Sequence, residues 1–180
     1  KNGDSHYWGV WHGNHEPIGY YNKERSRFFT EYGFQSFPEF ESVKIYAPEE
    51  RDHDIYSEVM LSHQRAETFA NRMINQYMLQ EFKKPKDFEH FLYVGMILQG
   101  DAIKIAMEAH HRDMPYCMGT LFWQINDCWP VASWSSRDYY GRWKAVQYFA
   151  KKAYRQILIS PYLRNDSVTV TLVSDTRKPV

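Results

Sequence analysis

The sequence has 180 residues, a length that suits a single domain with a workable core, and it carries 22 basic and 22 acidic side chains. This balanced charge gives no indication of a nucleic acid or an anionic membrane as a partner. No stretch approaches the roughly 18 apolar residues of a membrane span, and residues 1–5 are not a signal peptide, which says little about the compartment.

The first notable segment is residues 6–13, HYWGVWHG. Its aromatic residues are interrupted by Gly9 and Gly13, so we predict an aromatic loop or a short strand.

Residues 27–38, RFFTEYGFQSFP, begin as an aromatic, β-favouring run of the kind that forms a buried strand. Gly33 and Pro38 end the run. The carboxylate of Glu31 lies near the end of this apolar segment, where it is costly unless it is hydrogen-bonded or used. The carboxyl ends of strands in α/β barrels carry catalytic groups. A structural carboxylate bonded to the backbone or to an arginine is the alternative.

Charged, irregular sequence follows up to residue 52, and residues 62–82 then show the apolar spacing of a helix. Asp87 is a candidate N-cap for a second, stronger helix. That helix should extend to residues 110–112, His-His-Arg, where cations suit a helix C-terminus.

Residues 118–127, MGTLFWQIND, form a continuous apolar run of the kind found in parallel barrel strands. Cys117 and Cys128 flank this run, which would hold them roughly 20 Å apart, whereas a disulfide requires Cα atoms within about 7 Å. We therefore predict two free thiols, packed rather than reactive, and draw no conclusion about the compartment.

A last helix is predicted from Tyr140 to Ala153, and the character of the sequence changes near residues 159–161. Residues 168–173 alternate as a half-buried strand does. Only two clear βα units are present, whereas a barrel needs eight to close, and two or three parallel strands alone would leave bare edges. The sequence therefore predicts a piece of a longer protein.

The run FFTEYGFQSFP closely resembles the nucleophile segment of family 2 glycoside hydrolases, and its GFQS resembles the β-mannosidase branch. The resemblance covers most of the chain. It implies an α/β fold: residues 1–157 would be the C-terminal part of a (β/α)8 TIM barrel, and residues 158–180 the first strands of an immunoglobulin-like β-sandwich. It places Glu31 on the seventh barrel strand as the nucleophile. A nucleophile must be ionised, so a cationic or hydrogen-bond donor group should lie nearby.

The segment HYWGVWHG is also similar to a β-mannosidase loop that lines the sugar site. The resemblance implies that His6, Tyr7 and Trp8 shape the sugar pocket, although Trp8 and Trp11 could instead only plug the barrel. The strand from residue 118 resembles the eighth barrel strand of the family, with a tryptophan beneath the sugar. That role falls to Trp123, with a non-proline cis peptide expected after it, and substrate contacts are expected from the two residues that begin the following loop, Asn126 and Asp127.

Residues 11–16, WHGNHE, look like the family motif that carries the acid/base glutamate. Only half a βα unit separates Glu16 from Glu31, whereas the two catalytic carboxylates belong on strands four and seven. We therefore expect the acid/base upstream of Lys1 and an inactive isolated chain. The pairs His12/His15 and His110/His111 lack a third ligand, so no catalytic metal is predicted.

The resemblance implies an exo-glycosidase that hydrolyses a terminal β-linked mannose with retention and needs no cofactor. The partners implied are a β-mannoside oligosaccharide or glycan and the remaining domains of the parent chain. Aromatic residues form 17% of the chain, which fits a sugar cleft or simply a bulky core. Other family 2 sugars (β-galactose, β-glucuronic acid, β-glucosamine) and a non-catalytic carbohydrate-binding piece remain as alternatives. The compartment stays unknown; the resemblance alone favours periplasmic, secreted or lysosomal.

Overall fold

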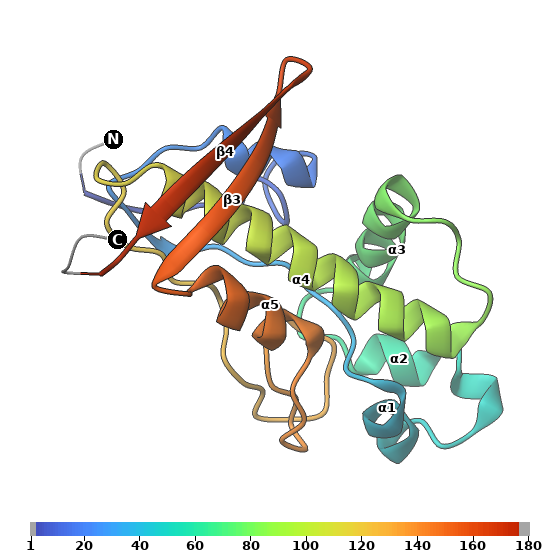
Figure 1. Cartoon of the computed structure of the whole chain (residues 1–180). Helices are drawn as coiled ribbons and strands as arrows, with labels where there is room; N and C mark the ends of the chain where they lie inside the picture. Colours follow the sequence, from blue (N-terminus) through green and yellow to red (C-terminus); the bar gives the residue numbers. More distant parts are fainter. Residues whose placement is uncertain (1–2, 177–180) are drawn as a thin grey trace.

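The computed structural model of the protein describes residues 3–176. The long helix α4 runs diagonally through the middle, the β3–β4 hairpin crosses it, α5 lies below it, and α1 to α3 gather at one end (Figure 1). The elements, in chain order, are β1 (Asp4–His6), η1 (Ile18–Asn22), β2 (Phe28–Glu31), α1 (Phe40–Tyr46), η2 (Glu50–Asp52), α2 (Glu58–Ser62), α3 (Phe69–Glu81), α4 (Phe88–Arg112), α5 (Ala145–Ala153), β3 (Ile157–Arg164) and β4 (Ser167–Ser174).

Three extended segments lie parallel to one another and carry the candidate site. β1 pairs with β2, and residues 118–123 run along the other side of β2 through a parallel bridge between Phe29 and Thr120. The Leu121 N–H donates to the carbonyl of Phe29 at 2.8 Å. The strand predicted over 118–127 is therefore present in its first part only. From Gln124 the chain leaves β2 and bonds to residues 134–137 instead.

Helix α4 forms as the sequence predicts. The carboxylate of Asp87 accepts a hydrogen bond from the His90 N–H at 2.9 Å, which confirms Asp87 as the N-cap. α4 packs closely on α5 because Gly100 has no side chain: a Cβ there would lie 2.7 Å from the ring of Phe149. His110 in the last turn is buried, and desolvation lowers its pKa to about 3, so it is not the terminal cation that we expected.

The helix prediction is wrong in three places. The helix expected over 62–82 begins only at Phe69, as α3, and the shorter α2 ends at Ser62. The segment between them is not helical, because Gln64 bridges to Ala132 and its side chain bonds to Asn71. The region expected to be irregular up to residue 52 contains α1 and η2. The last helix begins at Ala145 rather than Tyr140, because the preceding residues pair in a loop where Arg137 bridges to Trp143.

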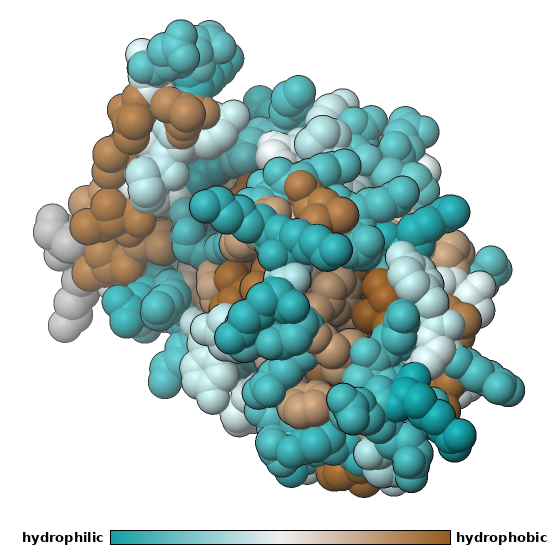
Figure 2. Space-filling model, turned by 90° about the vertical axis from the view of Figure 1, so that its right-hand side faces the viewer, coloured by the Kyte–Doolittle hydropathy of each residue, from teal (hydrophilic) through white to brown (hydrophobic). Residues whose placement is uncertain are grey.

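The hairpin of β3 and β4 confirms the strand predicted from the alternation over 168–173. One face packs toward α4, where the Ser160 hydroxyl donates to the carboxylate of Glu108. The other face is apolar and exposed, and forms the brown projection at the upper left of Figure 2. Its exposed residues pair across the two strands or extend the row: Ile157, Ile159, Leu163, Val168, Val170 and Leu172.

Cys117 and Cys128 are free thiols, as predicted, but only Cys117 is packed; Cys128 is exposed. No helix within residues 3–176 has the length and apolar character needed to cross a membrane. The mixed α/β arrangement fits a piece of a larger domain. Of the two predicted domains, residues 1, 2 and 177–180 lie outside the described part of the chain.

Candidate active site

The pairing register brings the residues of the candidate site to one end of the parallel segments. His6 at the end of β1 lies opposite Glu31 at the end of β2, and the Tyr7 N–H donates to the Glu31 carbonyl at 2.8 Å. Trp8 follows directly. Because the strands are parallel, these residues share the carboxyl end, the edge at which barrel enzymes carry their catalytic groups.

Two residues, one at the end of β1 and one just after it, lie beside the Glu31 carboxylate. The indole Nε1 of Trp8 donates to Oε1 at 2.7 Å, and Nδ1 of His6 lies 3.7 Å from the same oxygen. The side chain keeps 26% of its surface exposed. The expected hydrogen-bond donor beside Glu31 is therefore present, and part of the carboxylate remains open to a ligand.

Gly33, two residues after Glu31, is the point where the tryptophans of the site converge. A Cβ at this position would lie 2.7 Å from the Trp123 carbonyl oxygen, 2.8 Å from Cη2 of Trp8 and 3.0 Å from Cδ1 of Trp134. The rings of Trp8 and Trp134 meet edge to face, with centroids 5.9 Å apart. Glycine at position 33 is thus what lets these three residues close around the end of β2.

Trp123 ends the third parallel segment beside the same edge. Its N–H donates to the Tyr32 carbonyl at 2.8 Å, and its side chain is 43% exposed. The peptide bond between Trp123 and Gln124 is cis, as expected. The ring is therefore available to a ligand at the end of the strand that carries Glu31.

Other predicted site residues lie further from the carboxylate. Tyr7 is buried and meets Tyr21 edge to face, with ring centroids 5.8 Å apart, and burial raises its pKa. Trp11 lies fully in the core against Phe34, so it plugs the interior. Asn126 is exposed on the loop beyond Trp123.

Asp127 belongs to a buried polar layer beneath that loop. Its carboxylate accepts a hydrogen bond from the Ser135 hydroxyl at 2.5 Å, and desolvation raises its pKa. Lys144 is 1% exposed and donates to the carbonyls of Ser36 and Ser133, at 3.0 Å each. Desolvation lowers the pKa of Lys144 to about 8. The layer ties the loop after Trp123 to the chain that follows β2.

The comparisons with known proteins agree on one group. No family model matches the chain. It is 37% identical over 159 residues to β-mannosidase B of Thermothelomyces thermophilus, covering 83% of this chain and 18% of that protein. The crystal structure of a β-D-mannosidase from Dictyoglomus thermophilum matches with a TM-score of 0.92 and 36% identity, over 97% of this chain and 21% of that one. The chain is β-mannosidase-like.

The β-mannosidase-like chain thus spans about a fifth of the length of the relatives it matches. β-Mannosidase B of Aspergillus terreus is 28% identical over 179 residues, which is 98% of this chain and 21% of that protein. A structure of the exo-β-D-glucosaminidase CsxA has a TM-score of 0.69 at 19% identity, over 94% of this chain and 21% of that one, which is a likeness of fold alone. The similarity to β-mannosidases thus extends over nearly the whole of this chain and over about a fifth of each relative.

Two residues around Trp8 carry no site role in the sequence analysis. His12 and Trp134 surround its indole, with His12 centred 5.1 Å from it, and burial lowers the pKa of His12. His12 lies four residues after Trp8 in the same aromatic loop, so its contact with Trp8 could have been predicted from the sequence. Trp134 has no such local signal, because it reaches Trp8 only through the turn of the chain after Trp123.

The β-mannosidase-like chain forms no metal cluster in its described part: no group of three or more His, Cys, Asp or Glu side chains between residues 3 and 176 could hold an ion.

Glu16, which the sequence analysis rejected as the acid/base, is fixed in place by hydrogen bonds of its backbone. Its N–H donates to the Gly9 carbonyl at 3.0 Å, and its carbonyl accepts from the Tyr77 hydroxyl at 2.9 Å.

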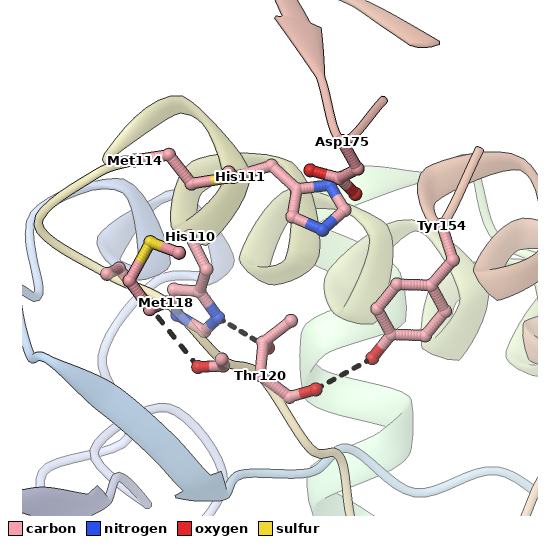
Figure 3. A pocket seen from close by; sticks show the side chains of 9 residues that line it. His110, His111, Met114, Met118, Thr120, Tyr154 and Asp175 are labelled. Carbon is pink, nitrogen blue, oxygen red and sulfur yellow. Dashed lines mark hydrogen bonds between the residues drawn. The ribbon is translucent and has the colours of Figure 1, made fainter. Parts of the chain in front are cut away.

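A hollow of about 290 Å³ lies near the other end of segment 118–123 (Figure 3). Nδ1 of His110 lies 2.8 Å from the Thr120 hydroxyl, and the Tyr154 hydroxyl donates to the Thr120 carbonyl at 3.1 Å. His111 and Asp175 line the opposite wall in this view. Because it lies toward the amino ends of the strands, this hollow is separate from the candidate site.

Proposed function

We propose that this chain supplies the nucleophile and part of the sugar pocket of a retaining exo-β-mannosidase. The observation that carries the proposal is the 2.7 Å hydrogen bond from Trp8 to Glu31 at the shared carboxyl end of β1 and β2. A partly exposed carboxylate held by one fixed donor is oriented for attack, and its other oxygen remains free for chemistry.

Glu31 attacks the anomeric carbon of a terminal β-linked mannose, and the glycosidic C–O bond breaks as a glycosyl ester forms. A second carboxylic acid, about 5–5.5 Å away in retaining enzymes, protonates the leaving oxygen and then takes a proton from the water that hydrolyses the ester. In our proposal this acid comes from the parent chain upstream of Lys1. The isolated chain should therefore hydrolyse nothing, and no cofactor is needed.

The sugar pocket in this proposal combines two kinds of contact. The exposed ring of Trp123 stacks on the apolar face of the sugar, while His6 and Trp8 fix Glu31 and approach the sugar hydroxyls. Tyr7 and Asp127 are both buried, so we assign them to the support of the site rather than to contact with the sugar. Asn126 is exposed and retains its predicted substrate role.

Mannose is the first choice because the relatives with the higher identities are named β-mannosidases. The likeness to an exo-β-D-glucosaminidase rests on fold at 19% identity and keeps β-glucosamine as the second candidate. Activity of the complete enzyme on aryl β-mannoside, compared with the corresponding galactoside, glucuronide and glucosaminide, decides between these sugars.

The remaining domains of the parent chain complete the fold in this proposal. Residues 1–157 form the end of a (β/α)8 barrel, whose other strands would pair with the outer edges of β1 and segment 118–123. Residues 158–180 begin a β-sandwich. The exposed apolar face of the β3–β4 hairpin supports this, because sandwich sheets bury such a face against a second sheet.

The decisive experiment replaces Glu31 with alanine in the complete parent enzyme. Turnover of an aryl β-mannoside should fall by several orders of magnitude while sugar binding persists. Azide should then restore turnover and yield a glycosyl azide of inverted configuration, because it attacks from the vacated face. Glu81→Ala, at an exposed glutamate ending α3, is the matched control. A retained product would make Glu31 the acid/base, and near-native kcat would end the proposal.

A further inference from the structure

Tyr21 is a buried tyrosine of the short helix η1, which packs on α4. Its side chain is 1% exposed, so it is not a contact for a bound sugar. Burial raises the pKa of its phenol well above the usual value, and the hydroxyl therefore stays neutral and able to donate a hydrogen bond. A buried polar group needs a partner, and the partner of Tyr21 belongs to the candidate site.

The hydroxyl of Tyr21 donates to the carbonyl of Gly33 at 3.1 Å. Gly33 is the residue at which Trp8 and Trp123 close around the end of β2, and a Cβ at position 33 would lie only 2.8 Å from Cη2 of Trp8. A shift of the backbone at Gly33 would therefore displace the indole of Trp8. The hydrogen bond from Tyr21 thus fixes a residue whose position decides where that indole can lie.

The ring of Tyr21 meets the two residues that adjoin Trp8 and Glu31 in the sequence. It lies edge to face with Tyr7, which precedes Trp8, with ring centroids 5.8 Å apart. It also lies edge to face with Tyr32, which follows Glu31, with centroids 6.1 Å apart. Because side chains alternate along an extended chain, these two rings point away from the side that carries the hydrogen-bonded pair. Tyr21 therefore packs behind that pair and contacts both segments that carry it.

An arginine in the last turn of α4 holds η1 in place. Nη2 of Arg112 donates to the side-chain oxygen of Asn22, the residue after Tyr21, at 2.5 Å. Nη1 of Arg112 donates to the Ser160 hydroxyl of β3, also at 2.5 Å. The Glu108 carboxylate accepts from the same hydroxyl and lies 3.8 Å from the guanidinium. Tyr21 is thus carried by a helix that is anchored both to α4 and to the β3–β4 hairpin.

We propose that Tyr21 is a positioning residue, which sets the place of the Trp8 indole relative to the Glu31 carboxylate from behind the candidate site. It acts through Gly33 and through the two rings that it packs against. This inference rests on the proposed function, because it takes Glu31 as the nucleophile that Trp8 orients. It deepens that function by assigning the support of the Trp8–Glu31 hydrogen bond to a residue outside the sugar pocket.

The test is Tyr21→Phe in the complete parent enzyme, which removes the donor and keeps the ring contacts. The loss of one neutral hydrogen bond should lower kcat for an aryl β-mannoside roughly three- to tenfold. KM should stay within about twofold, because no contact with the sugar is removed. Tyr46→Phe in α1 is the matched control, since the Tyr46 hydroxyl is buried but has no hydrogen-bond partner within residues 3–176. Equal kcat values for the wild type and Tyr21→Phe would overturn the inference.

A double-mutant cycle separates positioning from a merely structural role. If Tyr21 acts by placing the Trp8 indole, Tyr21→Phe should lower kcat by less than about twofold once Trp8→Phe has removed the donor to Glu31. If Tyr21 only stabilises the fold, the same loss should appear with and without Trp8→Phe. A loss of equal size in both backgrounds would therefore refute the positioning role.

A spectroscopic measurement separates this inference from the proposed function. In fluorine NMR of the parent enzyme labelled with fluorotryptophan, the resonance that disappears in Trp8→Phe reports on the Trp8 indole. This resonance should shift in Tyr21→Phe and stay in place in Tyr46→Phe. If Glu31→Ala keeps near-native kcat, the proposed function fails, and the Trp8 resonance still tests the role of Tyr21. A resonance that Tyr21→Phe leaves unmoved refutes that role.

Discussion

The indole nitrogen of Trp8 and the carboxylate of Glu31 are joined by a hydrogen bond of 2.7 Å, although 23 residues separate them in the sequence. The contact exists because β1 and β2 run parallel and place His6 opposite Glu31, so that the chain leaving β1 passes over the end of β2. A donor fixed in this way orients one oxygen of the carboxylate without covering the other.

Replacing Trp8 with phenylalanine should keep most of the packing against Trp134 and remove the donor to Glu31. Hydrogen bonds to charged groups contribute about 1.5–3 kcal/mol, so kcat/KM of the complete enzyme for a β-mannoside should fall roughly 10- to 100-fold. Trp129→Phe, on the loop after Trp123, is the control. Unchanged kinetics in Trp8→Phe would show that the hydrogen bond does not position the nucleophile.

Gly33→Ala should damage the site more than it damages the fold. The added methyl group would collide with the Trp123 carbonyl at 2.7 Å and with Trp8 at 2.8 Å, which pushes both away from Glu31. We expect kcat/KM to fall at least tenfold. Gly19→Ala provides the control, because a Cβ at position 19 meets no atom within 4 Å. Equal activity of the two variants would contradict this view of the site.

Local signals predicted the parts of the fold that form from local interactions. Asp87 caps α4 as its position before an apolar stripe indicates, and the alternation over 168–173 becomes β4. Helix α1 has no side-chain cap, and its Val43 is fully buried. It follows Pro38 within charged sequence and is held by packing, so periodicity could not identify it.

The candidate site likewise contains residues that the sequence could predict and contacts that it could not. Glu31 could be selected from its place at the end of an apolar strand, but its contact with Trp8 depends on a pairing register that the sequence does not state. Side chains alternate along an extended chain, so Tyr7 lies on the opposite side from its neighbours His6 and Trp8. This alternation could have separated Tyr7 from the residues that surround Glu31. Trp134 reaches the site only through tertiary contacts.

Lys144→Met should destabilise the fold, because Nζ of Lys144 satisfies the buried carbonyls of Ser36 and Ser133. Each unsatisfied buried group costs about 1–3 kcal/mol. The pKa of Lys144 is about 8 in the folded state and near 10.5 unfolded, so the wild type gains stability as pH rises from 8 to 10.5. The deficit of the variant should therefore grow by about 1.4 kcal/mol per pH unit in that window.

Unfolding midpoints of the complete enzyme and the variant, measured from pH 7 to 10, test this expectation. Comparing the two curves cancels the titration of other groups, including tyrosines such as Tyr77, whose pKa burial raises to about 12. A deficit that stays constant with pH would mean that Lys144 remains charged throughout.

His110→Gln should make the protein more resistant to acid. Burial lowers the pKa of His110 to about 3, against 6.5 for an ordinary histidine, while its ring stacks on Phe29 with centroids 3.7 Å apart. Below pH 6.5 the unfolded chain binds a proton that the folded chain does not, so wild-type stability falls as pH decreases. The loss should approach about 1.4 kcal/mol for each pH unit between 6 and 4.

Glutamine can keep a hydrogen bond to the Thr120 hydroxyl but does not titrate, so the variant should lack this part of the acid sensitivity. The variant is expected to be less stable than the wild type at pH 7, because the stacking on Phe29 is lost, and the gap should narrow or reverse toward pH 4. Unfolding midpoints measured from pH 4 to 7 provide the comparison. Parallel curves would show that His110 takes up its proton in the folded protein as readily as in the unfolded chain.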